Sequence, residues 1–329
     1  MSDERVLVTG GTGCIGSWIV RNLVRENVAV VVLTASQRFG RLKLILTDAE
    51  FGRINFVAAD ISDMATIEAA SRRHGINRII HLAGMQLPFC AADPIRGAQV
   101  NVGGTVTIFE LAKRLGVERV VYASSAAVYG PRTHYQEATL GPGAAFFPTS
   151  HYGVYKVANE QSASVYWRSD GISSVGLRPH SVYGPGRDQG MTSKPTVAMI
   201  AAAAGRPYHI GFNGRYQFQF VDDVAKAFVR ALRIPFAGTA VYDIGGSTTG
   251  VDEIVRCIEA HAPDARGRIT LGNRPLQLPE AFDGRPIAEA LGPRAETPLD
   301  VGVGRTLDCY RAALRDGILD DAYLDRVLA

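Results

Sequence analysis

The chain has 329 residues, of which 47% are hydrophobic and 20% are charged, and its formal net charge is +3. This composition predicts a well-packed globular protein of one large domain or two, and it excludes a disordered chain. A charge balance so close to neutral, with arginines scattered along the chain, predicts neither nucleic acid nor a membrane as a partner.

Apolar runs and cysteines limit the location and the chemistry. No apolar run approaches the ~20 residues that a membrane span needs. The chain opens directly on a predicted strand, so we expect a cytoplasmic protein without a secretory signal. No cysteine belongs to a C-x-x-C pair or a Cys/His cluster, so we expect no disulfide framework and no metal site. The four cysteines are Cys14, Cys90, Cys257 and Cys309.

A glycine-rich turn follows the first predicted strand, in the segment VLVTGGTGCIGS at residues 6–17. Its glycines match G-x-x-G-x-x-G, and from Gly11 onward also G-x-G-x-x-G. Such glycines form a tight turn, let the backbone approach a pyrophosphate, and let the next helix pack close to the strand. The pyrophosphate then lies at the helix N-terminus, where free N–H groups point toward it. Unless the turn is purely structural, its candidate cofactor-binding residues are Gly10, Thr12, Gly13, Cys14, Ile15 and Gly16.

Strands and helices alternate through the rest of the first half. Apolar, β-branched runs predict strands at residues 28–33, 54–58, 78–82, 119–123 and 175–178, with another strand near Tyr242. Helical patterns cover residues 17–25, 64–74, 94–115, 150–167, 195–204 and 251–261, and two more helices end the chain. Continuous apolar strands alternating with helices predict a doubly wound parallel sheet, that is, an α/β fold of the Rossmann type. We expect residues 1–180 to form the dinucleotide-binding domain. Residues 181–329 then form mainly a smaller substrate-binding lobe, which can return one or more strands to the sheet.

Three polar side chains form a candidate catalytic group. Ser125 follows the predicted strand at 119–123, and Tyr152 and Lys156 open the next helix at the spacing Y-x-x-x-K. Residues four apart share one helix face, so both side chains can face Ser125. A lysine ammonium and a cationic nicotinamide are expected to lower the pKa of the phenol from its usual value of about 10. The phenolate can then take a carbinol proton while hydride leaves for the nicotinamide, with Ser125 hydrogen-bonded to the same substrate oxygen.

Over nearly its whole length, the chain resembles the extended short-chain dehydrogenase/reductases, the family of sugar-nucleotide epimerases and dehydratases. The matching segments are TGGTGCIGS, Asp60-Ile61, HLAG at 81–84, NVGGT at 101–105, SSAAVYG, YGVYK, LRPHSVYGPGR and FVDDVA at 220–225. The resemblance implies an NAD(P)-dependent enzyme, with Asp60 accepting a hydrogen bond from the adenine and the HLAG strand beside the cofactor ribose. It also implies a homodimer formed through the helices at about 94–115 and 150–169, unless these merely cover the sheet. The further cofactor-binding residues implied are Asp60, Ile61, Leu82, Ala83, Gly84, Asn101, Tyr152 and Lys156.

Departures from the family pattern concern the cofactor and the reaction. Thr34 stands where NAD-using members carry an acidic residue that holds the ribose hydroxyls. Ser36 and Arg38 are suited to bind a 2′-phosphate instead, which favours NADP over NAD, unless the arginine is an ordinary solvated charge. Ala126 and Ala127 replace the Asp-Glu pair that family dehydratases use to remove water. A methyl group cannot transfer a proton, so dehydration is disfavoured, as is the decarboxylation that also needs the glutamate.

Other departures concern the substrate. Tyr216 aligns with an arginine that usually holds a substrate diphosphate, although a slip of one residue would place Arg215 there. Ser181 replaces an asparagine expected after the LR strand. Both losses favour a smaller, non-nucleotide substrate. His180 has three interpretations: a substrate ligand, an additional acid/base, or a structural histidine. The candidate substrate contacts are Gln86, Ser125, His180, Arg187 and Gln189.

We therefore expect an NAD(P)-dependent oxidoreductase acting on a secondary alcohol or ketone of a sugar-like or other small polar substrate. Tyr152 is the expected acid/base, Lys156 lowers its pKa and holds the ribose, and Ser125 orients the substrate oxygen. The alternative is a sugar or nucleotide-sugar epimerase that uses the same three residues and retains its cofactor. A third hypothesis, a non-catalytic cofactor-sensing protein, needs the glycine turn but not the catalytic group.

Overall fold

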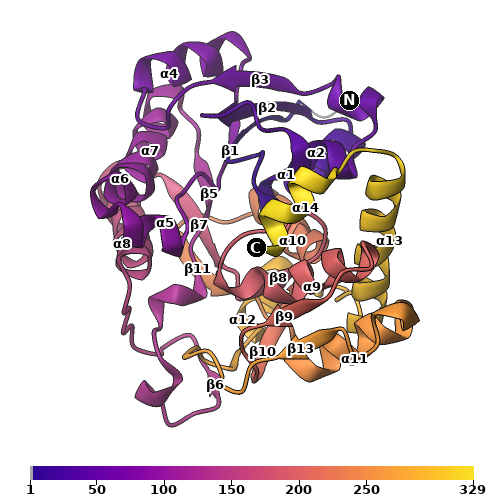
Figure 1. Cartoon of the computed structure of the whole chain (residues 1–329). Helices are drawn as coiled ribbons and strands as arrows, with labels where there is room; N and C mark the ends of the chain where they lie inside the picture. Colours follow the sequence, from indigo (N-terminus) through magenta and orange to yellow (C-terminus); the bar gives the residue numbers. More distant parts are fainter. Residues whose placement is uncertain (1–2) are drawn as a thin grey trace.

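The computed structural model describes residues 3–329. Within them, seven parallel strands form the central sheet in the order β3-β2-β1-β4-β5-β7-β11 (Figure 1). The strand order reverses between β1 and β4, which in such sheets marks the crevice where ligands bind. The predicted doubly wound, Rossmann-type α/β fold is confirmed. The strands are β1 (Arg5–Thr9), β2 (Ala29–Thr34), β3 (Asn55–Ala58), β4 (Arg78–His81), β5 (Arg119–Ala123), β7 (Ser173–Arg178) and β11 (Thr239–Asp243).

Helices cover both faces of this sheet, because alternate residues of a strand point to opposite faces. On β1, Val6 and Val8 pack with α1 (Cys14–Arg25) and α10 (Val221–Arg233). Leu7 packs on the other face with α4 (Met64–Arg73), α7 (Gly104–Leu115) and α8 (His151–Asp170). Both faces of such a strand are buried, so its side chains are apolar without alternation. This explains the uninterrupted apolar segments from which the strands were predicted.

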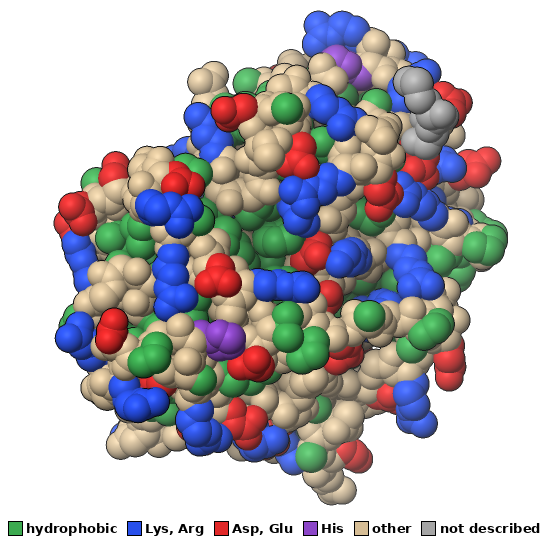
Figure 2. All heavy atoms as spheres, turned by 90° about the vertical axis from the view of Figure 1, so that its right-hand side faces the viewer, with side chains coloured by type: hydrophobic (Ala, Val, Ile, Leu, Met, Phe, Trp, Pro, Cys, Tyr) green, Lys and Arg blue, Asp and Glu red, His purple; other side chains and the backbone are tan. Residues whose placement is uncertain are grey.

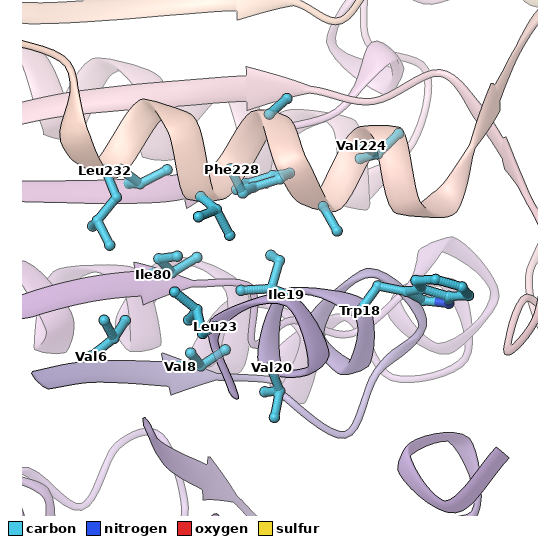
Figure 3. Close-up of a cluster of buried hydrophobic side chains, with 14 of the residues drawn as sticks. Val6, Val8, Trp18, Ile19, Val20, Leu23, Ile80, Val224, Phe228 and Leu232 are labelled. Carbon is cyan, nitrogen blue, oxygen red and sulfur yellow. The ribbon is translucent and has the colours of Figure 1, made fainter. Parts of the chain in front are cut away.

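Helix α10 was not predicted, although it forms half of the core on its face. Figure 3 shows Ile19 and Leu23 of α1 pointing toward Phe228 and Leu232 of α10, with Ile80 of β4 beside them. Phe228 is fully buried. Helix α10 therefore ties the second half of the chain to the strand and helix that flank the glycine turn.

The helix expected over 94–115 is interrupted. It consists of α6 (Pro94–Ala98), a π-helical turn at Gln99–Gly103 and α7. The Asn101 side chain explains the wider turn, since its Nδ2 donates to the Gly97 carbonyl at 3.0 Å and competes for a regular helical acceptor. Such π-turns are frequent at functional sites.

The second half of the chain builds a smaller sheet. Strands β8 (Ser181–Tyr183) and β10 (Arg215–Phe220) are parallel, and β12 (Ser247–Gly250) pairs antiparallel with β10. A second apolar core lies between this sheet and α9 (Lys194–Ala203), α11 (Val251–His261) and α13 (Leu299–Arg315). Strand β11 leaves this half and pairs with β7 in the central sheet.

Shorter elements complete the described chain. They are α2 (Gly40–Ile45), α3 (Asp48–Phe51), α5 (Leu87–Ala92), the 3₁₀ turns Ala126–Val128, Arg132–His134, Met191–Ser193 and Pro263–Ala265, β6 (Thr139–Leu140), β9 (Tyr208–Ile210), β13 (Ile269–Leu271), β14 (Ala281–Phe282), α12 (Arg285–Leu291) and α14 (Asp321–Leu328).

Figure 2 shows basic and acidic side chains interspersed over one face of the molecule. Among residues 3–329, none of the helices combines the length and the apolar character that crossing a membrane requires.

The α1–α10 contact should dominate the stability of this half of the core. Phe228→Ala is expected to lower the free energy of unfolding by about 3–5 kcal/mol, because it removes a buried ring and leaves a cavity. Urea denaturation followed by circular dichroism measures the loss. Phe89→Ala is the matched control: that ring is 49% exposed and should cost little. A loss below about 1 kcal/mol for Phe228→Ala would show that α10 is not an essential part of the core.

Candidate active site

The glycine turn joins β1 to α1 at the reversal of strand order. Gly10 has a φ of +69°, and a Cβ there would lie 2.7 Å from the backbone nitrogen of Ala83. At Gly16 a Cβ would collide with the Gly10 carbonyl. The N-cap of α1 is Gly13, and no side chain caps the helix, so its first N–H groups are available to an anion. This cradle fits the pyrophosphate of a dinucleotide.

A continuous cleft runs from the glycine turn past the ends of β4 and β5 to His180 and Leu278. It collects most of the residues that the sequence singled out. Those lining it are Gly10, Thr12, Gly13, Cys14, Ile15, Gly16, Leu82, Ala83, Gly84, Gln86, Ser125, Tyr152, Lys156, His180, Arg187 and Gln189.

Ser125 lies just beyond the end of β5. Its backbone is extended, and it caps the 3₁₀ turn Ala126–Val128 by accepting a hydrogen bond from the Ala127 N–H at 3.1 Å. The Ser125 hydroxyl also lowers the pKa of the Tyr152 phenol. Both side chains line the same cleft.

Tyr152 and Lys156 occupy the first turns of α8, which begins after the N-cap Ser150. The Lys156 Nζ donates to the Ala123 carbonyl at 2.7 Å and lies 5.6 Å from the centroid of the Tyr152 ring. This hydrogen bond fixes the start of α8 against the end of β5, so all three candidate groups line one stretch of the cleft.

Protonation at this site differs from the expectation. Desolvation raises the pKa of Tyr152 above its usual value, while the hydrogen bond from Ser125 and the charge of Arg187 oppose that rise. Desolvation also lowers the pKa of Lys156 to about 8. Burial therefore outweighs the expected effect of the lysine on the phenol, and within the protein itself both groups are shifted toward their neutral forms.

A buried ionic network supports the site, and the sequence reasoning missed it. Arg178 of β7 donates to both carboxylate oxygens of Glu160 on α8, at 2.8 and 2.7 Å. Glu160 also accepts a hydrogen bond from Ser124, the neighbour of Ser125. The network joins β5, β7 and α8 directly behind the candidate catalytic groups. The signal in the sequence was its spacing: Glu160 follows Lys156 by four residues and therefore lies on the same face of α8.

Five predicted cofactor residues do not line this cleft. Ser36 and Arg38 are exposed beyond the end of β2. The Asp60 carboxylate accepts hydrogen bonds from Ser62 and pairs with Arg96, and these contacts hold its pKa at about 2. Ile61 is buried and would clash with a Cβ on Gly104. Asn101 is buried in the π-turn, with its Oδ1 unpaired and close to Gly84.

The comparisons with known proteins agree with this geometry. The model of the NAD dependent epimerase/dehydratase family matches residues 6–245. The chain belongs to this family. The resemblance inferred from the sequence motifs is thus confirmed, as is the expectation of an enzyme that uses a nicotinamide cofactor.

Relatives of known name support the same family. The UDP-glucose 4-epimerase of Mycolicibacterium smegmatis is 32% identical over 320 residues, covering 93% of this chain and 98% of that protein. The putative UDP-glucose 4-epimerase of Methanocaldococcus jannaschii is 30% identical over 311 residues, covering 92% and 97%. The structure of Thermus thermophilus UDP-glucose 4-epimerase in complex with NAD has a TM-score of 0.78 at 26% identity, covering 94% and 99%.

Beyond the ends of β4 and β5, the cleft is lined by both polar and apolar side chains. Gln86 Oε1 and Arg187 Nε are buried without a hydrogen-bond partner among the described residues. His180 has both ring nitrogens engaged, one with the Pro279 carbonyl at 2.8 Å and one with Ser181 at 3.0 Å. Desolvation lowers its pKa to about 4, so His180 is neutral near pH 7, which argues against a role as an additional acid/base.

Several residues that line the cleft were not singled out from the sequence. Arg41 is one of them: it donates to Asp188 and lines the cleft. Apolar side chains from α5, from the loop before it, from the turn at 191–193 and from the segment between β13 and β14 also line the cleft, and no motif or spacing marked them. These are Met85, Leu87, Pro88, Phe89, Met191 and Leu278.

The buried lysine should make stability depend on pH. The pKa of Lys156 falls from 10.5 unfolded to about 8 folded. Between these two pH values the unfolded chain binds more protons at this lysine than the folded protein does. The contribution of Lys156 to the free energy of unfolding therefore rises with pH through this window. Relative to Lys156→Met, the native protein should gain up to about 3 kcal/mol between pH 7.5 and 10.5. Urea unfolding of both proteins across this range measures the difference. Parallel stability curves would show that Lys156 is not desolvated.

Proposed function

We propose that the protein is an epimerase that inverts a hydroxyl-bearing carbon of a sugar or nucleotide sugar through transient oxidation by a tightly held nicotinamide cofactor. The observation that carries this proposal is the meeting of Ser125, Tyr152 and Lys156 in the cleft that also contains the glycine turn. The named relatives favour epimerization over the net oxidoreduction expected from the sequence.

Ser125, Tyr152 and Lys156 have different roles in the proposed reaction. Ser125 donates a hydrogen bond to the substrate oxygen, and Tyr152 accepts the carbinol proton as the C–H hydride departs. A bound nicotinamide supplies the hydride acceptor. Tyr152 then returns the proton to the carbonyl oxygen when hydride comes back on the opposite face, so the net reaction changes configuration only. Lys156, anchored on the Ala123 carbonyl, holds the helix turn that carries Tyr152.

The environment of the phenol matches this two-way role. Because burial raises its pKa, Tyr152 holds its proton near neutral pH, and its phenolate is a stronger base for the carbinol proton. The Arg187 charge and the Ser125 hydrogen bond favour the phenolate needed in the first step. Ala126 and Ala127 line the same stretch of the cleft, and neither methyl group can remove water from the intermediate.

A net dehydrogenase acting on a free, non-nucleotide substrate is the second candidate. It is favoured by the side chains at the start of β10. The Tyr216 hydroxyl donates to the Asn213 carbonyl at 2.9 Å, and Arg215 pairs with Glu253 at 3.2 Å, so neither lines the cleft. Ser181 contacts His180 instead. No arginine from β10 therefore reaches a substrate diphosphate.

The choice of cofactor and the assembly are further parts of the proposal. NADP is preferred over NAD because Thr34 ends β2 and the exposed Ser36 and Arg38 follow it, whereas an acidic residue there would repel a 2′-phosphate. A homodimer through α7 and α8 is supported by the exposed apolar side chains of Val154 and Val165 on α8.

Replacing the phenol tests the central role. Tyr152→Phe should lower kcat by about 10²–10⁴, because the acid/base is lost while the ring remains. Tyr155→Phe is the matched control. Tyr155 also lies in the first turns of α8, but its hydroxyl donates to the Pro94 carbonyl and it does not line the cleft. Steady-state kinetics on an identified substrate measures both variants. Turnover of Tyr152→Phe within tenfold of the native rate would refute the proposed role.

Redox balance separates the two candidates. As an epimerase, the protein should purify with a bound nicotinamide nucleotide and should interconvert substrates without net change in NAD(P)H absorbance. Chromatography of the released nucleotide and of the sugar products measures this.

Stoichiometric consumption of NAD(P)H would select the dehydrogenase.

Thermal unfolding of the loaded protein with UDP then addresses the substrate class, since a ligand of the native state raises the melting temperature. A rise with UDP supports a nucleotide sugar, and no rise supports a free sugar.

A further inference from the structure

The segment 184–190, GPGRDQG, joins β8 to the 3₁₀ turn Met191–Ser193, and we call it the strap. Its residues Arg187, Gln189 and Gly190 line the cleft together with the glycine turn. Gly184, Gly186 and Gly190 have φ values of +124°, +89° and +98°, so the chain turns sharply along the strap.

Three helices anchor the strap from outside the cleft. Trp18 Nε1 of α1 donates to the Pro185 carbonyl at 2.9 Å, and the Gly186 N–H donates to the Tyr310 hydroxyl of α13 at 2.9 Å. The Tyr323 hydroxyl of α14 donates to Asp188 at 3.3 Å. These contacts hold the outer side of the strap.

On the side of the cofactor cleft, Asp188 is held by Arg41 of α2. One carboxylate oxygen accepts from Arg41 Nε at 3.0 Å and from Nη2 at 2.6 Å. The Arg41 side chain is 23% exposed and the Asp188 side chain 8%, so the pair is shielded from salt more than a surface pair is. Arg41 itself lines the cleft, so this ion pair bridges α2 and the strap at the edge of the cofactor cleft.

The strap carries a charged side chain into the cleft. The charge of Arg187 acts both on Cys14 in the glycine turn and on Tyr152. Its Nη2 donates to Thr192 at 3.1 Å, and its Nε has no partner among the described residues. A positive group between the turn and the phenol complements the pyrophosphate expected at the N-terminus of α1.

We propose that Arg41 and Asp188 are positioning residues that hold the strap, and with it Arg187, across the bound dinucleotide, so that the cofactor leaves only when this ion pair opens. The inference rests on the cofactor assignment in the proposed function, but not on the identity of the substrate. It gives a structural reason for cofactor retention through turnover, which an epimerase needs and a dehydrogenase that exchanges its cofactor does not.

Cofactor release measures the role of the ion pair directly. Asp188→Asn keeps the side-chain shape but removes the charge. Release of NADPH from the loaded protein, followed by loss of nicotinamide fluorescence during a chase with NADP, should become about 10- to 100-fold faster, the range expected for a charged hydrogen bond. Arg41→Gln should accelerate release to the same extent. Asp188→Glu keeps the carboxylate, so its release should stay as slow as that of the native protein.

Two further comparisons make the test specific. Asp325→Asn removes an exposed ion pair between α14 and Arg206, and it should leave NADPH release unchanged. The double variant R41Q/D188N should match either single variant, because each change removes the same contact. Hydrogen exchange of the strap amides in D188N should rise to the same extent as the release rate.

The proposal is overturned if NADPH release from D188N stays within twofold of the native rate, if the single effects multiply in R41Q/D188N, or if release accelerates without faster exchange in the strap. None of these measurements requires turnover. Native turnover of Tyr152→Phe together with fast release from D188N would refute the catalytic proposal and support the role of the strap. Loss of turnover in Tyr152→Phe together with slow release from D188N would do the opposite.

Discussion

The hydrogen bond from the Lys156 ammonium to the Ala123 carbonyl fixes α8 against the end of β5, and the active-site geometry depends on it. Tyr152 lies one helical turn before that contact, and Ser125 lies two residues after the carbonyl. The ionic network of Ser124, Glu160 and Arg178 joins the same two elements from behind. A change in the distance between α8 and β5 would therefore separate the phenol from the hydroxyl directly. Tyr152 is thus carried by α8, and Ser125 by the short turn that follows β5.

The same burial that holds these groups opposes their ionisation. It raises the pKa of Tyr152 and lowers the pKa of Lys156 to about 8. From the spacing of the residues we expected the lysine and a cationic nicotinamide to lower the pKa of the phenol, since spacing shows which residues are near but not how much water they lose. In the folded protein desolvation is the largest cause, and charge within the cleft opposes it. Favouring the phenolate therefore depends on positive groups that face the cleft, of which Arg187 is one.

Local sequence signals predicted the fold and most of the cleft. The strand–turn–helix at residues 6–17 and the pair Tyr152 and Lys156 are each contained in one short segment, so their geometry follows from backbone rules. Contacts between distant segments could not be predicted in this way. Arg41 and Asp188 are 147 residues apart, and neither residue belongs to a recognisable spacing. Helix α10 had a readable apolar pattern, but its place beside α1 depends on the whole topology. The domain boundary near residue 180 stays a prediction.

The strap places cofactor exchange and substrate recognition on one segment. Arg187, beside the phenol, is also among the polar groups at the substrate end, where Gln86 has an unpaired oxygen. If β10 supplies no arginine to a diphosphate, as the positions of Arg215 and Tyr216 indicate, substrate binding relies on the strap and on the loop after β4. A substrate bound there would itself help to hold the strap closed. Closing the cleft around an oxidised intermediate and retaining the dinucleotide would then be one event, which is what reversible hydride transfer at a single carbon requires.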